Sequence, residues 1–315
     1  MLVEYAKSED MQNRVCAPLL LFVYNRPDHT LQTIDALKKN ELSEETDLVI
    51  FSDAPSKSNH ENDVLKVREL IHGVSGFKSV EIIERRTNMG LAASIIDGVT
   101  KVCNERGRVI VLEDDLVTSP YFLRYMNDAL NLYSDDERVI SVCAYAFPLN
   151  CSMPENYFLC DPGCWGWATW KRGWDLFEQD GLKLLSALQN KKLEYRFNFS
   201  NSYDYIGMLK SQISGINDSW AVRWYASAFL NEKLTIYPGK TLVSNIGTDG
   251  SGRHRDSSNL FVAVLSSAAI QLGEANVEEN LIVREALIKY LRSIRAAWPR
   301  RTLNYFRNQL LTILK

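Results

Sequence analysis

The chain has 315 residues, of which 46% are hydrophobic and 24% are charged, the proportions of an ordinary globular protein with a full core. Its formal net charge of −3 gives no reason to expect nucleic acid as a partner. No stretch reaches the roughly 18 consecutive apolar residues that a membrane-spanning helix needs, and the N-terminus lacks the basic start and apolar run of a signal peptide. The six cysteines are scattered and form no disulfide framework, so we expect a cytoplasmic protein.

The first half of the chain alternates short apolar runs with helical patterns. Residues 1–15 are polar, and we expect them to be poorly ordered. Strands are predicted at residues 19–24, 47–52, 79–84, 109–112 and 139–147. Helices are predicted at residues 30–39, 61–71, 91–103 and 121–133. This alternation indicates βαβ units, and therefore an α/β fold with a Rossmann-like, mostly parallel sheet flanked by helices.

Three carboxylates, Glu113, Asp114 and Asp115, directly follow the predicted strand at residues 109–112. Adjacent like charges repel, and each needs water, a cation or a hydrogen-bond donor. Open α/β sheets bind ligands at the carboxyl ends of their strands. Hard oxygen ligands at that position suit Mg²⁺ or Mn²⁺ bridging to a diphosphate. A solvated acidic turn is the alternative interpretation.

Polar residues also follow the first two predicted strands. Asn25 and Arg26 come after the first strand, and Asp53 comes after the second. Right-handed crossovers place all these strand ends on one side of the sheet. The convergence of these groups with the acidic triplet favours a nucleotide-type site over an acidic turn.

Residues 160–174 contain four tryptophans and three glycines. Tryptophan is common in hydrophobic cores, but aromatic faces on a loop can also hold the apolar side of a sugar ring. Cys160 and Cys164 in this stretch, together with His254, are a poor zinc signal because a second cysteine pair is lacking.

Residues 245–254 form a glycine-rich segment that suggests a mobile lid. It does not follow a strand and open a helix, so it matches neither a P-loop nor a Rossmann turn. His254 at its end could be a further metal or phosphate ligand, and a surface histidine is about as good an interpretation. Asp249 is a weaker candidate.

These blocks, in this order from Leu19 to His254, resemble GT-A fold glycosyltransferases. Within that fold they are similar to bacterial sugar transferases related to family 2 glycosyltransferases and to the N-acetylglucosaminyltransferase I type. The resemblance implies that Arg26, with Asn25 beside it, contacts the donor diphosphate. It also implies that Asp53 recognises the uracil.

The same resemblance assigns the acidic motif and the tryptophan-rich loop. In the motif that begins with Glu113, Asp115 would bind the metal and Asp114 would lie near the ribose. The loop from Gly163 to Trp167 would lie beside the donor sugar.

Asp218, in the segment Asp218-Ser219-Trp220, matches the position of the family's catalytic base. An inverting sugar transfer needs one carboxylate to take the proton of the acceptor hydroxyl, and Trp220 could partly desolvate this one. The alternative is that Asp218 caps the following helix. The chain departs from the family pattern at Ser219, where a second acid is replaced.

The C-terminal stretch from Leu281 to Lys315 carries eight basic residues against one acidic residue, Glu285, a balance of +7. Its apolar residues recur at three- and four-residue spacing. Such a helix can lie on an anionic membrane surface, with Trp298 and Phe306 inserted. A helical pair packed on the catalytic domain, with its basic residues in water, is the alternative.

The sequence therefore predicts three parts: a poorly ordered segment at residues 1–15, a GT-A catalytic domain at residues 16–256 and a basic helical appendage at residues 257–315. The predicted function is that of a metal-dependent, inverting glycosyltransferase using Mn²⁺ or Mg²⁺. It would move a hexosyl or N-acetylhexosaminyl group from a UDP-sugar to a hydroxyl of a glycan acceptor, with a lipid-linked acceptor as one option, in bacterial surface polysaccharide synthesis. A sugar nucleotidyltransferase and a non-catalytic carbohydrate- or nucleotide-binding protein are the alternatives.

Overall fold

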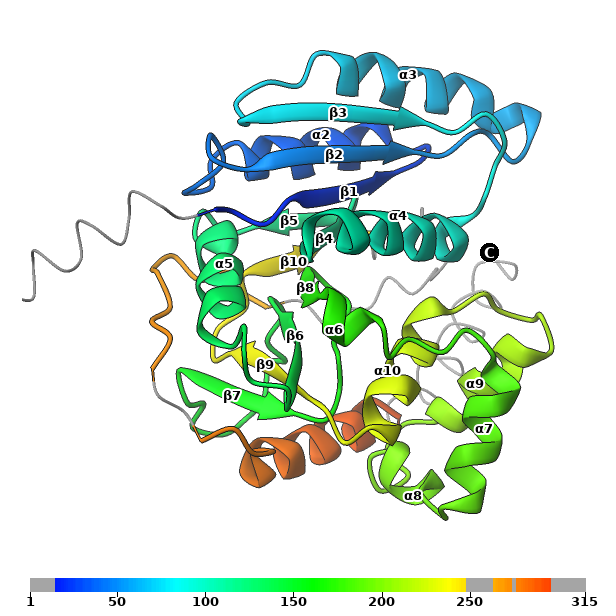
Figure 1. The fold of residues 1–315 in the computed structure, drawn as a ribbon, viewed down its shortest axis with the longest axis vertical. Helices are drawn as coiled ribbons and strands as arrows, with labels where there is room; N and C mark the ends of the chain where they lie inside the picture. Colours follow the sequence, from blue (N-terminus) through cyan, green and yellow to red (C-terminus); the bar gives the residue numbers. More distant parts are fainter. Residues whose placement is uncertain (1–14, 248–262, 274–275, 296–315) are drawn as a thin grey trace, which may run out of the picture.

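The computed structural model describes residues 15–247, 263–273 and 276–295. Its centre is an eight-stranded sheet in the order β3-β2-β1-β4-β8-β6-β9-β7 (Figure 1). The strands are β1 (Leu19–Val23), β2 (Asp47–Ser52), β3 (Ser79–Glu84), β4 (Arg108–Glu113), β6 (Val139–Cys143), β7 (Asn156–Leu159), β8 (Trp167–Trp170) and β9 (Leu234–Pro238). A separate antiparallel pair is formed by β5 (Leu116–Thr118) and β10 (Val243–Asn245).

Four of the seven pairings in the large sheet are parallel. The exceptions are β8, which is antiparallel to both of its neighbours, and β7, which is antiparallel to β9. The other six strands run in one direction, so their carboxyl ends meet at one edge of the sheet. The predicted α/β architecture with a mostly parallel sheet is confirmed, and the reversed strand β8 in its centre was not predicted.

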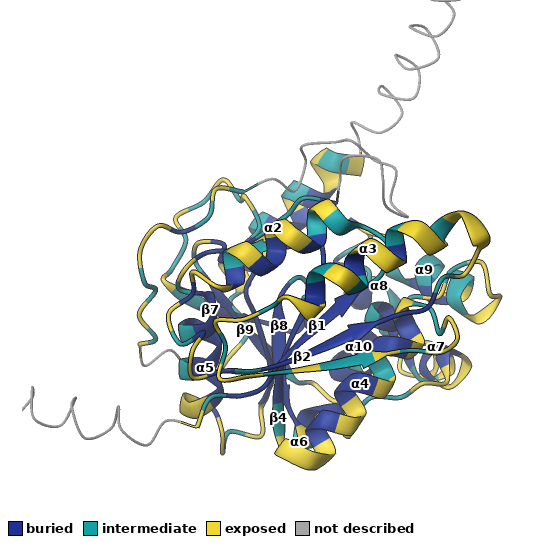
Figure 2. Ribbon diagram, turned by 90° about the horizontal axis from the view of Figure 1, so that it is seen from above, coloured by how far each residue is buried: buried dark blue, intermediate teal, exposed yellow. Residues whose placement is uncertain are grey.

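Helices cover both faces of the sheet (Figure 2). Figure 2 shows α2 and α3 on one face and α4 and α6 on the other. The helices are α2 (Pro27–Leu37), α3 (Glu61–His72), α4 (Leu91–Arg106), α5 (Phe122–Leu132), α6 (Lys171–Trp174), α7 (Gly181–Asn190), α8 (Glu194–Phe197), α9 (Tyr205–Ile213) and α10 (Trp220–Leu230), with a short 3₁₀ turn, η1 (Ser58–His60).

Side chains of the central strands point alternately to the two faces of the sheet and so contribute to two hydrophobic cores. In β1, Leu19 and Leu21 pack with α2 and α3, whereas Leu20 and Phe22 pack with α4 and α10. All five residues of β1 are buried, because successive side chains point to opposite faces and both faces are covered. This explains the continuous apolar runs from which the strands were predicted.

Local signals in the sequence set where helices begin and end. Pro27 starts α2, where its fixed φ angle suits the first turn and its missing N–H would be unpaired anyway. The Asp180 side chain accepts hydrogen bonds from the N–H groups of Leu182 and Lys183 and so caps α7. Gly107 ends α4 with a φ angle of +78°, in the left-handed region that glycine adopts without a steric penalty.

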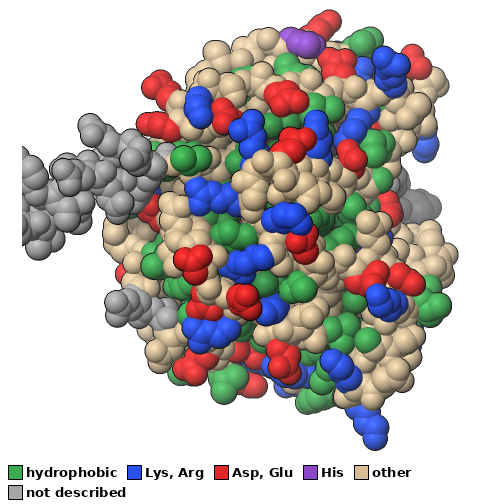
Figure 3. Space-filling view, viewed as in Figure 1, with side chains coloured by type: hydrophobic (Ala, Val, Ile, Leu, Met, Phe, Trp, Pro, Cys, Tyr) green, Lys and Arg blue, Asp and Glu red, His purple; other side chains and the backbone are tan. Residues whose placement is uncertain are grey.

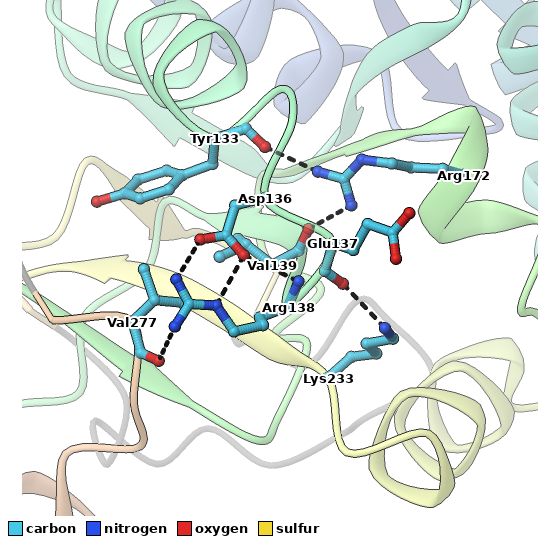
Figure 4. Close-up of polar contacts among 8 residues, drawn as sticks. All are labelled: Tyr133, Asp136, Glu137, Arg138, Val139, Arg172, Lys233 and Val277. Carbon is cyan, nitrogen blue, oxygen red and sulfur yellow. Dashed lines mark hydrogen bonds and ion pairs between the residues drawn. The ribbon is translucent and has the colours of Figure 1, made fainter.

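Basic side chains around the start of β6 donate hydrogen bonds to backbone carbonyls of neighbouring segments (Figure 4). Arg172 donates to the carbonyl of Val139 at 2.7 Å, and its guanidinium lies over the Trp170 ring. Arg138 donates to the carbonyl of Val277 at 3.4 Å, so the segment leading to the C-terminal helix is attached at the same place. These contacts lie at the amino end of β6, away from the sheet edge where the strand ends converge.

Residues 281–295 form a helix that packs against the body of the protein (Figure 1, orange). Val283, Leu287, Ile288 and Leu291 are each at most 5% exposed and belong to the same core as β1 and α2. An isolated bridge between Phe158 and Glu279 attaches the preceding residues to the edge of β7. The apolar stripe of this helix therefore faces protein, as in the packed alternative.

The remaining part of the C-terminal prediction, including Trp298 and Phe306, lies outside the described residues, as do residues 1–14. Within the described ranges, no helix has the length and apolar character needed to cross a bilayer. On the face shown in Figure 3, basic and acidic side chains are interspersed, with no continuous field of one sign.

Candidate functional site

The ends of β1 and β4 bring Arg26 together with the acidic triplet. Arg26 forms ion pairs with Asp114 and, at 3.0 Å, with Asp115. The N–H of Tyr24 also donates to Asp114 at 3.3 Å. The predicted convergence of these two strand ends is confirmed. We call Arg26, Glu113, Asp114 and Asp115 the strand-end cluster.

The strand-end cluster has more negative than positive charge. Three carboxyl groups face one guanidinium, which gives a formal charge of −2 when all are ionised. Burial, together with the charges of Asp115 and Asp114, raises the pKa of Glu113 to about 8. Burial likewise raises the pKa of Asp114 to about 6, although Arg26 opposes this shift. A second cation at this place would offset both effects.

The donor set of the cluster suits a divalent cation shared with a substrate. Asp115 keeps 15% of its side chain exposed and Arg26 keeps 20%, so ligands can reach both. The described residues contain no group of three or more histidine, cysteine or acidic side chains arranged to hold a metal. Mg²⁺ and similar hard cations are usually held by one or two carboxylates together with substrate phosphates. The residues present therefore fit a metal that Asp115 holds jointly with a diphosphate, and His254 lies outside the described residues.

The chain that leaves β10 passes directly over Asp115. The N–H of Ile246 donates to the carbonyl of Asp115 at 2.9 Å. A Cβ atom at Gly247 would collide with the Asp115 carboxylate and crowd the Arg26 guanidinium. Only glycine allows so close an approach of backbone to the cluster. The glycine-rich pattern indicated a lid but did not identify Gly247 as the residue in contact with Asp115.

Asp53 organises the turn before α4. Its carboxylate accepts hydrogen bonds from the N–H groups of Ala54, Met89 and Gly90, each at 2.9 Å, and from the Asn88 amide at 3.1 Å. A carboxylate offers about four acceptor positions, and four are in use. In this arrangement Asp53 holds the turn, and recognition of uracil by this carboxylate, which stays a prediction, would require one of these bonds to be exchanged.

Tyr24 is a residue that the sequence analysis missed. Its hydroxyl accepts a hydrogen bond from the Ser56 N–H at 2.8 Å and lies 2.8 Å from the His60 ring nitrogen Nδ1. It thereby connects the end of β1 to the loop after β2. The adjacent Asn25 is half-buried in the same turn. A tyrosine at the end of an apolar run looked like core, and only the folded chain shows its hydroxyl reaching another loop.

The placement of Trp167 beside a donor sugar is wrong. Trp167 lies in β8, is 1% exposed and stacks on Trp220 with ring centroids 5.2 Å apart. Because it is sealed between β4, β6 and α10, it cannot touch a ligand. Trp165 is instead half-buried in the preceding loop, with its ring edge against Tyr145 at 4.8 Å. The core interpretation holds for Trp167, and Trp165 is the tryptophan in this loop that keeps some exposure.

Close packing around Gly163 leaves no room for a side chain at this position. A Cβ atom there would lie 2.6 Å from the Cys143 sulfur and 2.7 Å from the Tyr237 hydroxyl. The Gly163 N–H donates to that hydroxyl at 2.9 Å. The loop is thus held tightly against β6 and β9. Burial raises the pKa of the neighbouring Cys164 thiol, and the charge of Glu113 in the strand-end cluster raises it too.

The zinc interpretation finds no support among the described residues. Burial, followed by the charge of Glu279, raises the pKa of Cys160 to about 12, and burial also raises that of Cys164. His254, the third residue of that interpretation, lies outside the described residues.

Asp218 lies just before α10 and is one of the residues that line a groove between α4 and α10. The alternative that Asp218 caps this helix is wrong, because Ser219 is the cap and its side chain accepts from the Val222 N–H at 3.2 Å. The Asp218 side chain is 53% exposed, and Trp220, which was expected to desolvate it, is buried in the core. A Cβ atom at Gly90 would lie 3.9 Å from the Asp218 carboxylate, which places Asp218 beside the turn that Asp53 holds.

No family model matches the chain, and no curated protein matches it. Among solved structures, the chain is similar to TarS of S. aureus, at 14% identity and a TM-score of 0.29, over 44% of this chain and 23% of that chain. It is similar to the mannosyltransferase PcManGT from Pyrobaculum calidifontis, solved with GDP-Man and Mn²⁺, at 12% identity and a TM-score of 0.32, over 72% of this chain and 81% of that chain. A UDP-glucose pyrophosphorylase complexed with UDP-glucose is similar at 11% identity and a TM-score of 0.35, over 70% and 90% of the two chains.

These structures include a glycosyltransferase, the class expected from the sequence, and a nucleotidyltransferase, the alternative class. The chain spans less than a quarter of the length of TarS. Since every one of these TM-scores is below 0.5, the likenesses carry no conclusion about activity, which must be sought in the site residues.

Proposed function

We propose that the protein is a metal-dependent, inverting glycosyltransferase that uses a UDP-sugar donor. The observation that carries the proposal is the strand-end cluster, in which Arg26 meets Asp114 and Asp115 at the carboxyl edge of a mostly parallel sheet with an excess of negative charge. A nucleoside diphosphate shared with a divalent cation fits such a site. The bound cation, Mn²⁺ or Mg²⁺, would neutralise the leaving diphosphate.

Each residue then has a defined task. Asp115 would hold the cation, with Asp114 and Glu113 behind it. Arg26, with Asn25 beside it, would direct its guanidinium fork to the phosphate oxygens. Asp53 would keep the turn before α4 in position at the uracil side.

Asp218 would accept the proton of the attacking hydroxyl. It is exposed, lies beside Gly90 and borders a groove that an acceptor can enter. A carboxylate in solvent contact is a competent base for this step only when the hydroxyl lies within hydrogen-bond reach. The loop from Gly163 to Trp165 would lie beside the donor sugar. Trp165, rather than Trp167, would then be the tryptophan next to that sugar.

A panel of UDP-sugars, incubated with Mn²⁺ and without acceptor, tests the proposal. A glycosyltransferase releases UDP and free sugar slowly, and only when metal is present. A nucleotidyltransferase releases diphosphate from UTP and a sugar 1-phosphate, and a binding protein shows thermal stabilisation by the ligand without any product. Either of the last two results would replace the proposed activity.

The transferred group, the acceptor and the cellular place are further parts of the proposal. We propose a hexosyl or N-acetylhexosaminyl group, moved in the cytoplasm to a lipid-linked glycan of a bacterial surface polysaccharide. Residues 296–315 carry Arg300, Arg301, Arg307 and Lys315 beside Trp298 and Phe306, a composition suited to an anionic membrane surface. Flotation with anionic vesicles should be lost when these residues are removed, and indifference to such vesicles at low salt would end the membrane proposal.

A further inference from the structure

A groove of about 550 Å³ lies between α4 and α10, and Asp218 is among the residues that line it. We call it the α4–α10 groove. Its volume is in the range of ligand-binding clefts. The polar residues that line it are Asp97, Thr100, Lys101, Gln179, Asp218 and Arg223. The strand-end cluster does not line it, so this is a separate opening that shares only the proposed base with the catalytic proposal.

Arg223 brings unused hydrogen-bond donors to the groove. Only 9% of its side chain is exposed. Its Nε donates to the Ser219 carbonyl at 3.2 Å and its Nη1 to the Gln179 carbonyl at 3.3 Å. Its Nη2 lies 3.9 Å from Asp218, too far for a hydrogen bond, and has no other acceptor in the described part of the chain. A nearly buried guanidinium with free N–H groups favours an oxygen ligand.

The charges around the groove leave a positive excess. Asp97 is already neutralised by an ion pair with Arg85. Asp218 faces Arg223 across 3.9 Å. Lys101 is exposed on the α4 wall and has no ion pair among the described residues. The charged residues of the lining, Asp97, Lys101, Asp218 and Arg223, balance formally, and Arg85 beside the groove adds a third positive charge, so that Lys101 is left without a counter-charge.

We propose that the α4–α10 groove is the acceptor site and that the acceptor carries an anionic group, a carboxylate or a phosphate, held between Arg223 and Lys101. This rests on the proposed function, because it gives Asp218 the hydroxyl to deprotonate. An anion at Arg223 Nη2 takes the place of the long contact to Asp218. The carboxylate of Asp218 is then free to accept a hydrogen bond from a neighbouring hydroxyl of the same acceptor.

The test measures binding of simple probes, independently of turnover. The probes are methyl β-glucuronide, glycerol 1-phosphate and the neutral methyl β-glucoside, titrated by calorimetry into the full-length protein at low salt. At least one anion should bind more tightly than the neutral glycoside. Preference for the glucuronide assigns a sugar acid, and preference for the glycerol phosphate assigns a phosphate-bearing acceptor.

Two variants and one control variant locate the binding. Lys101→Glu should lower the affinity for the preferred anion by roughly tenfold, which corresponds to the loss of one charge-assisted hydrogen bond. Lys39→Glu makes the same charge change at the end of α2, on the opposite face of the sheet, and should leave the affinity unchanged. Arg223→Lys keeps the positive charge but loses the planar guanidinium donors, and it should also lower the affinity for the anion.

Equal affinity for the neutral and anionic probes, or an affinity that Lys101→Glu does not alter, would overturn the proposal. A failure of the proposed function looks different: no UDP-sugar is turned over, whereas the anion still binds with its dependence on Lys101. The two ideas can therefore fail separately.

Discussion

Arg26 and Arg284 each pair with largely buried carboxyl groups, and their surroundings differ. Arg26 pairs with Asp114 and Asp115 in the strand-end cluster. Arg284, on the helix at residues 281–295, pairs with Glu279 at 3.0 Å. Arg284 also lies 3.4 Å from the Arg196 carbonyl, to which it donates, and its guanidinium is 5.1 Å from the centre of the Phe199 ring. Among the described residues, no aromatic ring lies against Arg26 in this way.

The charge balance of the two places differs as well. Around Arg284, the carboxyl groups of Asp161 and Glu279 meet two guanidiniums, because Arg196 lies 3.7 Å from Glu279. We call these four residues the C-terminal cluster. It is neutral when all groups are ionised, whereas the strand-end cluster keeps a charge of −2. A balanced buried cluster is complete without a ligand, and an unbalanced cluster at a strand edge is suited to binding a cation.

The largest effect is expected from Asp115→Asn. This change should lower turnover by about four orders of magnitude, because the charge stabilisation supplied by a catalytic cation is worth several kcal/mol. Mn²⁺-dependent binding of UDP should also be lost, while the melting temperature stays close to that of the wild type. The matched change Glu279→Gln should leave UDP binding intact and lower stability. If Asp115→Asn still binds UDP with unchanged metal dependence, the strand-end cluster is not a metal site.

Asp218→Asn keeps the shape of the side chain but cannot accept a proton. Turnover at saturating substrate should fall by roughly two to four orders of magnitude, and UDP affinity should stay within about twofold, since the residue stands outside the strand-end cluster. Steady-state kinetics with an identified acceptor measure both. Asp63→Asn, an exposed carboxylate on α3, is the control and should behave as the wild type. A defect in donor affinity alone would remove Asp218 from the role of base.

Arg26→Gln and Arg284→Gln compare the two arginines directly. Arg284→Gln should lower the free energy of unfolding by up to about 3–5 kcal/mol, because it removes the nearer of the two guanidiniums that face the largely buried Glu279. Adding Mn²⁺ should not recover this loss. In Arg26→Gln, Mn²⁺ should recover stability, since the cation can replace the guanidinium between the carboxylates. Urea unfolding with and without Mn²⁺ measures this recovery of stability. If Mn²⁺ restores the stability of both variants, or of neither, the distinction between the two arginines is wrong.

A smaller effect is expected from pH acting on Asp161. Burial, and then the charge of Glu279, raise its pKa to about 7, with Arg284 opposing. The folded protein therefore keeps a proton on Asp161 that the unfolded chain loses above about pH 4, so this group's contribution to stability declines as the pH rises from about 4 to 7. Asp161→Asn should remove this decline, an effect on the order of a few kcal/mol. Identical slopes of stability against pH in the two proteins would show that Asp161 is ionised in the fold.

Much of the N-terminal half could be predicted from the sequence, because its signals are local. Apolar runs such as Leu19–Val23 mark strands buried on both faces, and polar residues directly after them mark the sheet edge where ligands bind. The tryptophan-rich stretch could not be resolved in the same way. Trp165 and Trp167 are two residues apart, and one is half-buried in a loop while the other is sealed in a strand. Their different surroundings come from β4, β6 and α10, which are far away in the chain.

The sequence by itself determined the α/β class, the first four strands and the meeting of Arg26 with the acidic triplet, since each follows from local periodicity and from the handedness of βαβ crossovers. Tertiary structure alone decided the reversed direction of β8, the approach of Gly247 to Asp115 and the cap at Ser219 in place of Asp218. It also decided that the stripe of Val283, Leu287 and Leu291 meets protein. An amphipathic pattern states that one face of a helix must leave water. Which surface receives that face depends on contacts between residues distant in the chain.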